Sequence, residues 1–163
     1  MFNIPTSYQQ RTGAKGAMLD IYEWTIRNLQ EDIRDLREND LVRIRDANTT
    51  DENCRSVQTV LTHVVHAGYG YAVTIQNRNQ GALVRPDKIL RTDIREYLTD
   101  LDRLFEYTED LFESIREDEL EEYLEERKMK TNWGQHYDIE QLMEHAIVHV
   151  LRHHRQILKF ISA

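Results

Sequence analysis

The strongest constraint on the fold is a helical spacing of apolar residues that recurs in four long segments of the chain. Apolar side chains return every three to four positions in each segment, and none shows the sustained period-two alternation typical of strands. The segments run from about Ala14 to Arg37, Ser56 to Asn77, Thr92 to Arg116 and Ile139 to Ile161. Four amphipathic helices bury their apolar faces best against one another, so the sequence predicts an all-α four-helix bundle.

The connections between these segments fit a single domain that spans residues 1–163. Residues 79–87 contain glycine, asparagine and proline and separate the second and third helices, and Thr92 or Asp93 can cap the third. The fourth helix follows a break at residues 132–134, and its predicted cap is Asp138. The polar stretch 39–53 predicts a loop with a short turn, and the acidic stretch 117–130 predicts a further short helix.

The second helical segment is unusual because it contains no Asp, Glu, Lys or Arg from Ser56 to Asn77. A helix with a solvent-facing side normally carries charge there, so this helix is expected to be covered on most sides. It also carries His63 and His66. Buried histidines need hydrogen-bond or metal partners.

Composition limits the cellular context and excludes some partners. No apolar stretch is long enough to span a membrane, and Met1 to Arg11 lacks the features of a secretion signal, so we expect a cytoplasmic protein. Cys54 is the only cysteine, which rules out an intrachain disulfide and favours a plain structural role. The net charge of −8 and the scattered basic residues argue against binding to nucleic acid.

The acids are concentrated in the run from Glu117 to Glu126. Such a run usually forms a solvated surface, and we favour that interpretation. The alternative is an acidic docking module for a cationic partner.

The fourth helix carries the histidines that best fit a metal site. Side chains four positions apart on a helix point the same way, so His149 and His153 can bind one ion, and His145 with His149 is a competing pair. His145 and His153 are roughly 12 Å apart along the helix, so the three cannot share an ion. His149 and His153 lie nearer the apolar face, which favours the inner pair.

A third ligand has to come from another helix, and His63 is the best candidate. Ala67 and Gly70 follow on its side of the helix, and their small side chains would leave room beside the imidazole. His66 is the rival, although it points away from this small stripe. Three protein ligands and an open position are typical of a catalytic rather than a structural metal site. Spacing alone, however, does not distinguish metal ligands from packing histidines.

Several other metal and nucleophile motifs are absent from the sequence. No glutamate stands three residues before these histidines, so the di-iron pattern of helical bundles is missing. The chain also lacks His-Glu-x-x-His, a phosphate-binding glycine loop and a serine nucleophile elbow.

Two stretches resemble the DinB/YfiT-like metalloenzyme family. They are the helix with His63 in Leu-Thr-His-Val-Val-His-Ala-Gly, and the last helix with His149-x₃-His153 followed by His-Arg-Gln. The resemblance spans nearly the whole chain, and its most specific part is Trp133-Gly134 followed by the last helix. Many members have glycine where this chain has Arg155, just before Gln156.

The resemblance implies an up-down-down-up bundle, one divalent ion such as nickel or zinc on three histidines, and a homodimer. Characterised relatives include transferases that join low-molecular-weight thiols to electrophiles and a thiol-dependent isomerase. We therefore expect a metal-dependent enzyme acting on a small molecule, either a thiol-dependent S-transferase or a hydrolase, with the ion lowering the pKa of a thiol or water. His63, His149 and His153 would be ligands, and Gln156, His145 and His66 would be possible outer neighbours.

The alternative belongs to another class of protein. The chain could be a non-catalytic helical dimer, such as a scaffold or a stress-related interaction protein, whose histidines bind metal adventitiously or structurally.

Overall fold

The computed structural model describes residues 11–162, and the predicted absence of a secretion signal therefore falls almost wholly outside the described residues. Five α-helices and one small antiparallel sheet are present in this part of the chain. The helices and strands are α1 Gly13–Ile33, α2 Glu38–Val42, α3 Val57–Gln76, α4 Ile94–Glu113, β1 Met129–Lys130, β2 His136–Tyr137 and α5 Ile139–Ile161.

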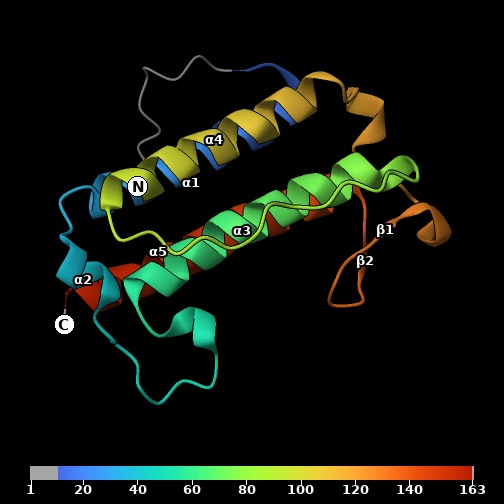
Figure 1. The fold of residues 1–163 in the computed structure, drawn as a ribbon. Coiled ribbons are helices and arrows are strands. Elements are labelled where there is room, and N and C mark those ends of the chain that lie inside the picture. Colours follow the sequence, from blue (N-terminus) through green and yellow to red (C-terminus); the bar gives the residue numbers. More distant parts are fainter. Residues whose placement is uncertain (1–10, 163) are drawn as a thin grey trace.

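The four long helices form the predicted bundle, which Figure 1 shows as a pair α1 and α4 packed over a pair α3 and α5. Helices α1 and α5 run in one direction, and α3 and α4 run in the other. The up-down-down-up topology expected from the resemblance is therefore confirmed. None of the helices in residues 11–162 is both long and apolar enough to cross a bilayer.

Because α3 and α4 are parallel, the chain has to return along the whole length of α3 before α4 begins. Residues 80–93, which we call the crossover, make this return (Figure 1). It is fixed to α3 by hydrogen bonds from Asn77 Nδ2 to the Leu83 carbonyl and from Gln58 Nε2 to the Arg91 carbonyl, both 2.9 Å. Together with α4 and α5 it covers α3, which accounts for the absence of charged side chains on that helix.

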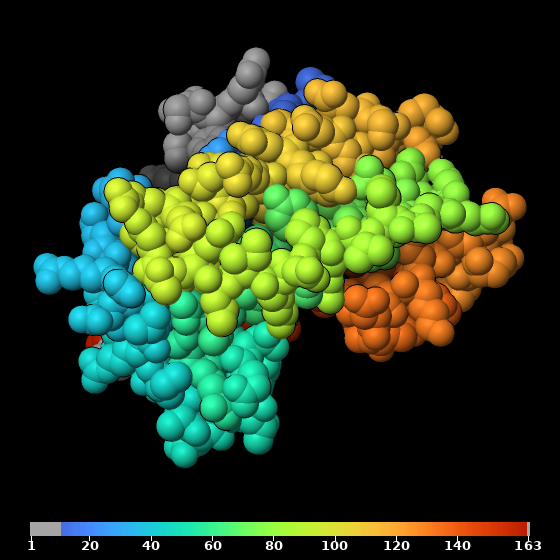
Figure 2. All heavy atoms as spheres, viewed as in Figure 1, coloured from blue at the N-terminus to red at the C-terminus, as the bar shows by residue number. Residues whose placement is uncertain are grey.

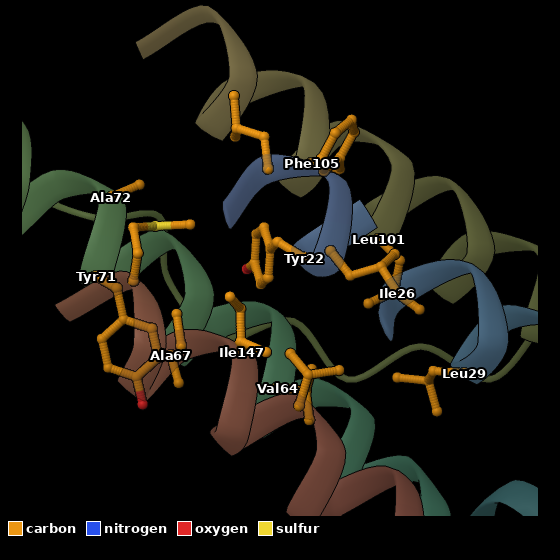
Figure 3. Packing of buried hydrophobic residues seen from close by; sticks show 14 of the residues in the cluster. Tyr22, Ile26, Leu29, Val64, Ala67, Tyr71, Ala72, Leu101, Phe105 and Ile147 are labelled. Atoms are coloured by element: carbon orange, nitrogen blue, oxygen red, sulfur yellow. The ribbon is translucent and has the colours of Figure 1, made fainter. Parts of the chain in front are cut away.

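The core lies between the two helix pairs, where their apolar stripes meet. Figure 3 shows Tyr22 and Ile26 of α1 facing Leu101 and Phe105 of α4, with Ile147 of α5 below them. Tyr22, Ile26 and Leu101 are at most 1% exposed. Burying side chains of this size stabilises a fold by about 1.5–3 kcal/mol each, so this interior holds the helices that carry the site.

The helix ends follow local sequence signals. Asp138 caps α5 by accepting a hydrogen bond from the Gln141 amide at 2.8 Å, and α5 has the predicted bounds. Asp93, rather than Thr92, caps α4 by accepting from the Arg95 amide at 2.9 Å. The first and third helices both end earlier than predicted, at Ile33 and Glu113.

The prediction of a further short helix in the acidic stretch 117–130 is wrong. The stretch forms two single 3₁₀ turns, Glu117–Glu119 and Glu125–Arg127, and then continues into β1. Carboxylates three and four residues apart repel one another on a helix, so the acidic run disfavours a longer one. Part of it is paired instead, since Arg116 binds Asp118 at 2.9 Å.

Two segments project from the bundle on either side of the crossover. Figure 2 shows the loop 45–55 in teal and the β1–β2 hairpin in orange, with the yellow-green crossover passing above the gap between them. The loop contacts α3 through its turn Glu52–Cys54, and the hairpin contacts α5 through β2.

Candidate metal centre

Three histidines from two neighbouring antiparallel helices converge between α3 and α5. His63 lies on α3, and His149 and His153 lie one turn apart on α5. The Nε2 atoms of His63 and His149 are 3.0 Å apart, and one ring nitrogen of each of the three histidines lies within 4.8 Å of the others. The structure thus brings together the three residues selected from the sequence.

The histidine cluster is largely shielded from solvent. His149 and His153 are 8% and 7% exposed, and His63 is half-buried. Burial, followed by the charge of a neighbouring imidazole, lowers the pKa of His63 to about 4 and that of His149 to about 3. Burial also lowers the pKa of His153. All three rings are therefore neutral near pH 7, which is the form that binds metal ions.

The spacing of the ring nitrogens fits a divalent ion. With metal–nitrogen bonds of about 2.0–2.1 Å in a tetrahedral arrangement, two bound nitrogens lie about 3.3 Å apart. The distance of 3.0 Å between His63 and His149 is close to this value, and small ring rotations would bring His153 to the same point. Three neutral imidazoles are a donor set that suits zinc and nickel.

Gln156 determines which nitrogen of His153 faces the cluster. His153 Nδ1 donates to Gln156 Oε1 at 3.0 Å, so the proton is on Nδ1 and Nε2 keeps its lone pair. Such a hydrogen bond on the far side of a ring is common for metal-binding histidines, because it fixes the tautomer and the ring orientation. This is the contact expected for Gln156 from its position one turn after His153.

His145 belongs to an aromatic group beside the cluster and lies outside the three-histidine set. Its ring stacks on Trp133 at 4.8 Å between centroids with an angle of 18°, and it contacts Tyr71 at 5.4 Å. The centroid of His145 is 6.4 Å from that of His149. Sequence analysis did not identify Tyr71 or Trp133 as site neighbours, although Trp133-Gly134 formed part of the family resemblance.

His66 is not brought to the cluster. It lines a separate small cavity of about 130 Å³ between α3, the crossover and α4, together with Thr62 and Tyr69. Burial lowers the pKa of His66, and the charges of Arg85 and Lys88 act in the same direction. The structure therefore gives no support to His66 as an outer neighbour of the three histidines.

Cys54 lies nearer to the site than the sequence indicated. It is half-buried, its Sγ is 3.5 Å from Asp51 Oδ2, and the side chain of Gln156 is also a hydrogen-bonding neighbour. Burial is the main cause that raises the pKa of Cys54, so the thiol stays protonated near pH 7.

The acidic run from Glu117 to Glu126 takes no part in the histidine cluster. Its carboxylates pair partly with cations of the same chain, including Glu119 with Arg78 at 3.2 Å. It borders a cavity of about 490 Å³ that also contains Arg127 and Lys128.

Comparison with known protein families gives a match over most of the chain. A family model described as the DinB superfamily matches residues 21–157, which include α3, α4 and all three histidines. The comparison with curated proteins found no match. Because the matched region covers most of the chain, we conclude that the protein belongs to the DinB superfamily.

Proposed function

We propose that the protein is a metal-dependent enzyme that holds one divalent ion, zinc or nickel, through His63, His149 and His153. The observation that carries this proposal is the convergence of three neutral, shielded imidazoles from two helices, within 4.8 Å of one another. Buried histidines that served only packing would be expected to pair with separate hydrogen-bond partners. Here the Nε2 atoms of His63 and His149 lie 3.0 Å apart, and a ring nitrogen of His153 lies within 4.8 Å of both histidines, so the three rings meet at one point.

An ion bound here would supply a lowered pKa for a thiol or water molecule at its open position. Two neighbouring residues would hold the metal-binding rings in place. Gln156 accepts a hydrogen bond from His153, and the centroid of the Tyr71 ring lies 5.6 Å from that of His149. Among residues 11–162 no carboxylate joins the three histidines as a candidate ligand. A metal-bound thiolate needs no general base for its attack, so such a site suits transfer of a small thiol to an electrophile better than hydrolysis.

The test is the metal content of protein purified without a histidine tag, washed with chelator and then loaded with zinc or nickel. Wild-type protein should retain about one ion per chain, and His149→Ala should lose it, because a site with two remaining imidazoles binds weakly. His66→Ala is the matched control. It removes a histidine from α3 outside the cluster, so metal content should not change.

A second measurement tests for catalysis. Metal-loaded protein should consume a small thiol in the presence of a reactive aryl halide, and His149→Ala should not. Unchanged metal content in His149→Ala would overturn the proposed site. Absence of both metal and thiol consumption in the wild type would favour the non-catalytic helical dimer.

A further inference from the structure

Tyr71 of α3 lies beside the three histidines, and ring contacts place it there. The centroid of its ring is 5.4 Å from that of His145 and 5.6 Å from that of His149, so Tyr71 is level with the turn of α5 between these two residues. The ring of His63 is 4.8 and 4.9 Å from those of His149 and His153, so it is level with the next turn. The two levels are about 6 Å apart along the helix. A small molecule bound at the histidine cluster could therefore also contact Tyr71.

Only a small side chain separates His63 from Tyr71 on α3. Ala67 lies midway between them in the sequence, and side chains four positions apart on a helix point the same way. Ala67 is 9% exposed, and its side chain ends at Cβ. It therefore does not fill the space between the rings of His63 and Tyr71.

The hydroxyl of Tyr71 is accessible, although most of the residue is buried. Tyr71 is 8% exposed, and Figure 3 shows its hydroxyl directed away from the labelled core residues. The hydroxyl makes no hydrogen bond within residues 11–162. In this part of the chain, the side-chain atoms that are both fully buried and unpaired are Nε of Arg45 and Nε of Arg55, so the hydroxyl of Tyr71 is open to a ligand.

Position, rather than the missing partner, distinguishes Tyr71 from other tyrosines. The hydroxyls of Tyr22 and Tyr69 also make no hydrogen bond within residues 11–162. Tyr22 is 1% exposed inside the core, however, and Tyr69 lines the separate cavity between α3, the crossover and α4. Their rings contact Phe105 and Tyr107. Of these three tyrosines, Tyr71 is the one that packs against a proposed metal ligand.

The aromatic residues next to Tyr71 leave few other hydrogen-bond donors at this end of the site. Trp133, 6.1 Å from Tyr71, donates from Nε1 to Gln135 Oε1 at 2.8 Å, and the Tyr137 hydroxyl donates to the same oxygen at 2.7 Å. The other ring with an unused donor is that of His145, whose centroid is 6.4 Å from that of the nearest cluster histidine. These rings form an apolar surface, where a hydrogen bond from Tyr71 to a ligand is stronger than in water.

We infer that the Tyr71 hydroxyl binds the oxygen of an electrophile that reacts with the thiol at the histidine cluster. The substrate class is a small apolar molecule whose oxygen gains negative charge as the carbon–sulfur bond forms, namely an epoxide or an α,β-unsaturated ketone. A hydroxyl donor stabilises such an oxygen more as its charge grows. The inference rests on the proposed function and extends it from electrophiles in general to those that carry this oxygen.

The reaction needs no oxidant or reductant. With an epoxide, the thiol sulfur forms a bond to a ring carbon, the carbon–oxygen bond breaks, and its electron pair stays on the oxygen. The oxygen then takes up the proton that the thiol gave up, and the product is a hydroxy thioether. With an unsaturated ketone, sulfur bonds to the β-carbon, the electron pair shifts to the carbonyl oxygen, and the proton ends on the α-carbon. The Tyr71 hydroxyl holds the oxygen while it carries charge.

The first experiment compares three electrophiles that share a phenyl group. Metal-loaded protein is assayed with β-mercaptoethanol and styrene oxide, benzylideneacetone or benzyl chloride. Tyr71→Phe should lower kcat/KM about 10- to 100-fold for at least one of the two oxygen electrophiles, as expected for a lost hydrogen bond to a charged group. Its kcat/KM for benzyl chloride should stay within about twofold of the wild type, because chloride leaves as a stable anion without a hydrogen-bond donor.

Two controls separate this role from a structural one. Tyr71→Phe keeps the ring that packs on His149, so it should keep the wild-type metal content. Tyr69→Phe removes a hydroxyl of the same helix that lies at the other cavity, and it should behave as the wild type with all three electrophiles. Equal losses of Tyr71→Phe with benzyl chloride and with the oxygen electrophiles, or no loss with any of them, would overturn the inference.

The second experiment needs neither metal nor thiol. Acetophenone, which has a phenyl group and a carbonyl oxygen but no reactive carbon for a thiol, is titrated into metal-free protein. The indole N–H signal of Trp133 reports binding by NMR, and that of Trp24 serves as the internal reference. The wild type should bind about 2- to 10-fold more tightly than Tyr71→Phe, as expected for one neutral hydrogen bond.

This measurement distinguishes failure of the inference from failure of the proposed function. If the wild type converts none of the three electrophiles but binds acetophenone more tightly than Tyr71→Phe does, the proposed function fails and the oxygen-binding role of Tyr71 stands. Equal affinity of the two proteins for acetophenone would overturn the inference.

Discussion

Gln156 shows how a single side chain can prepare a metal ligand. It accepts the Nδ1 proton of His153 and so leaves Nε2 free to face the other histidines. Gln156→Leu removes this acceptor, so the dissociation constant for zinc should rise about 10- to 100-fold, as is typical for such outer contacts. Competition with a chromophoric chelator measures the change.

The control for this prediction is Gln156→Glu, which keeps an oxygen acceptor at the same place and should bind zinc at least as tightly as the wild type. Equal zinc affinity of wild type and Gln156→Leu would show that the hydrogen bond does not support the site.

The neutral histidines also predict how stability depends on pH in the metal-free protein. The folded pKa values of His63 and His149, about 4 and about 3, lie below the ordinary value of 6.5. Between these pKa values the unfolded chain therefore binds more protons than the folded chain. The two neutral histidines contribute their full stabilisation above about pH 6.5, and this contribution is lost as the pH falls.

Urea unfolding of chelator-treated protein checks this prediction. The free energy of unfolding should drop by about 1–2 kcal/mol for His149 between pH 7 and pH 5. His149→Gln removes one of the titrating groups and should show a shallower pH dependence. If both proteins show the same slope, burial of His149 does not govern the acid response.

At the residue scale, the sequence predicted the three histidines because their signals are local. His149 and His153 are four positions apart, and His63 precedes the small residues Ala67 and Gly70 on an uncharged helix. The contacts of Trp133 with Tyr71 and His145 could not be predicted in the same way. They depend on how the hairpin folds back onto α3 and α5, which is a property of the tertiary structure.

At the scale of elements, α5 depends on its first turn. Asp138 caps the helix, is only 8% exposed and lies 3.6 Å from Lys128. Asp138→Ala should lower the free energy of unfolding by about 1 kcal/mol, within the usual range of about 0.5–2 for a lost cap. Urea unfolding at pH 7 measures it.

Asp138→Asn keeps the capping oxygen, so its free energy of unfolding should fall less than that of Asp138→Ala. Asp93→Ala removes the cap at the start of α4. This cap is partly exposed, so the free energy of unfolding should also fall less than in Asp138→Ala. A larger loss for Asp93→Ala than for Asp138→Ala would contradict this account of α5.

The long helices were predictable because their apolar period extends over many turns and their caps are local. The structure of the acidic stretch 117–130 was not predictable in this way. Its composition alone does not show that repulsion between carboxylates limits the helix to single turns. The β1–β2 hairpin was missed because two residues per strand are too few to show alternation. Its position beside His145 depends on the stacking of Trp133, which is a long-range contact.

At the scale of the whole molecule, the homodimer implied by the family resemblance stays a prediction. The outer side of α5 has exposed apolar residues that could form its interface, Val148 at 53%, Leu151 at 36% and Leu158 at 37%. Light scattering during size-exclusion chromatography should give the mass of two chains, and Leu151→Glu should shift it toward one chain by placing a charge in the interface.

The control is Ile44→Glu, an exposed apolar residue at 54% that lies in the loop after α2 and is not part of α5, and this variant should remain dimeric. A wild-type mass of one chain would refute the dimer, and an unchanged dimer in Leu151→Glu would place the interface elsewhere.

The separation of the ligands along the chain has a consequence for the lifetime of the protein. His63 and His149 are 86 positions apart, and the chain has no disulfide that could restrain so long a loop. An ion joining them would restrict the unfolded chain as a cross-link does, an effect of about 4–5 kcal/mol for a loop of this order. Unlike a disulfide, this cross-link would come and go with the supply of the ion. Chains made under metal starvation would then unfold more often and be degraded sooner, so the amount of protein would follow the amount of metal.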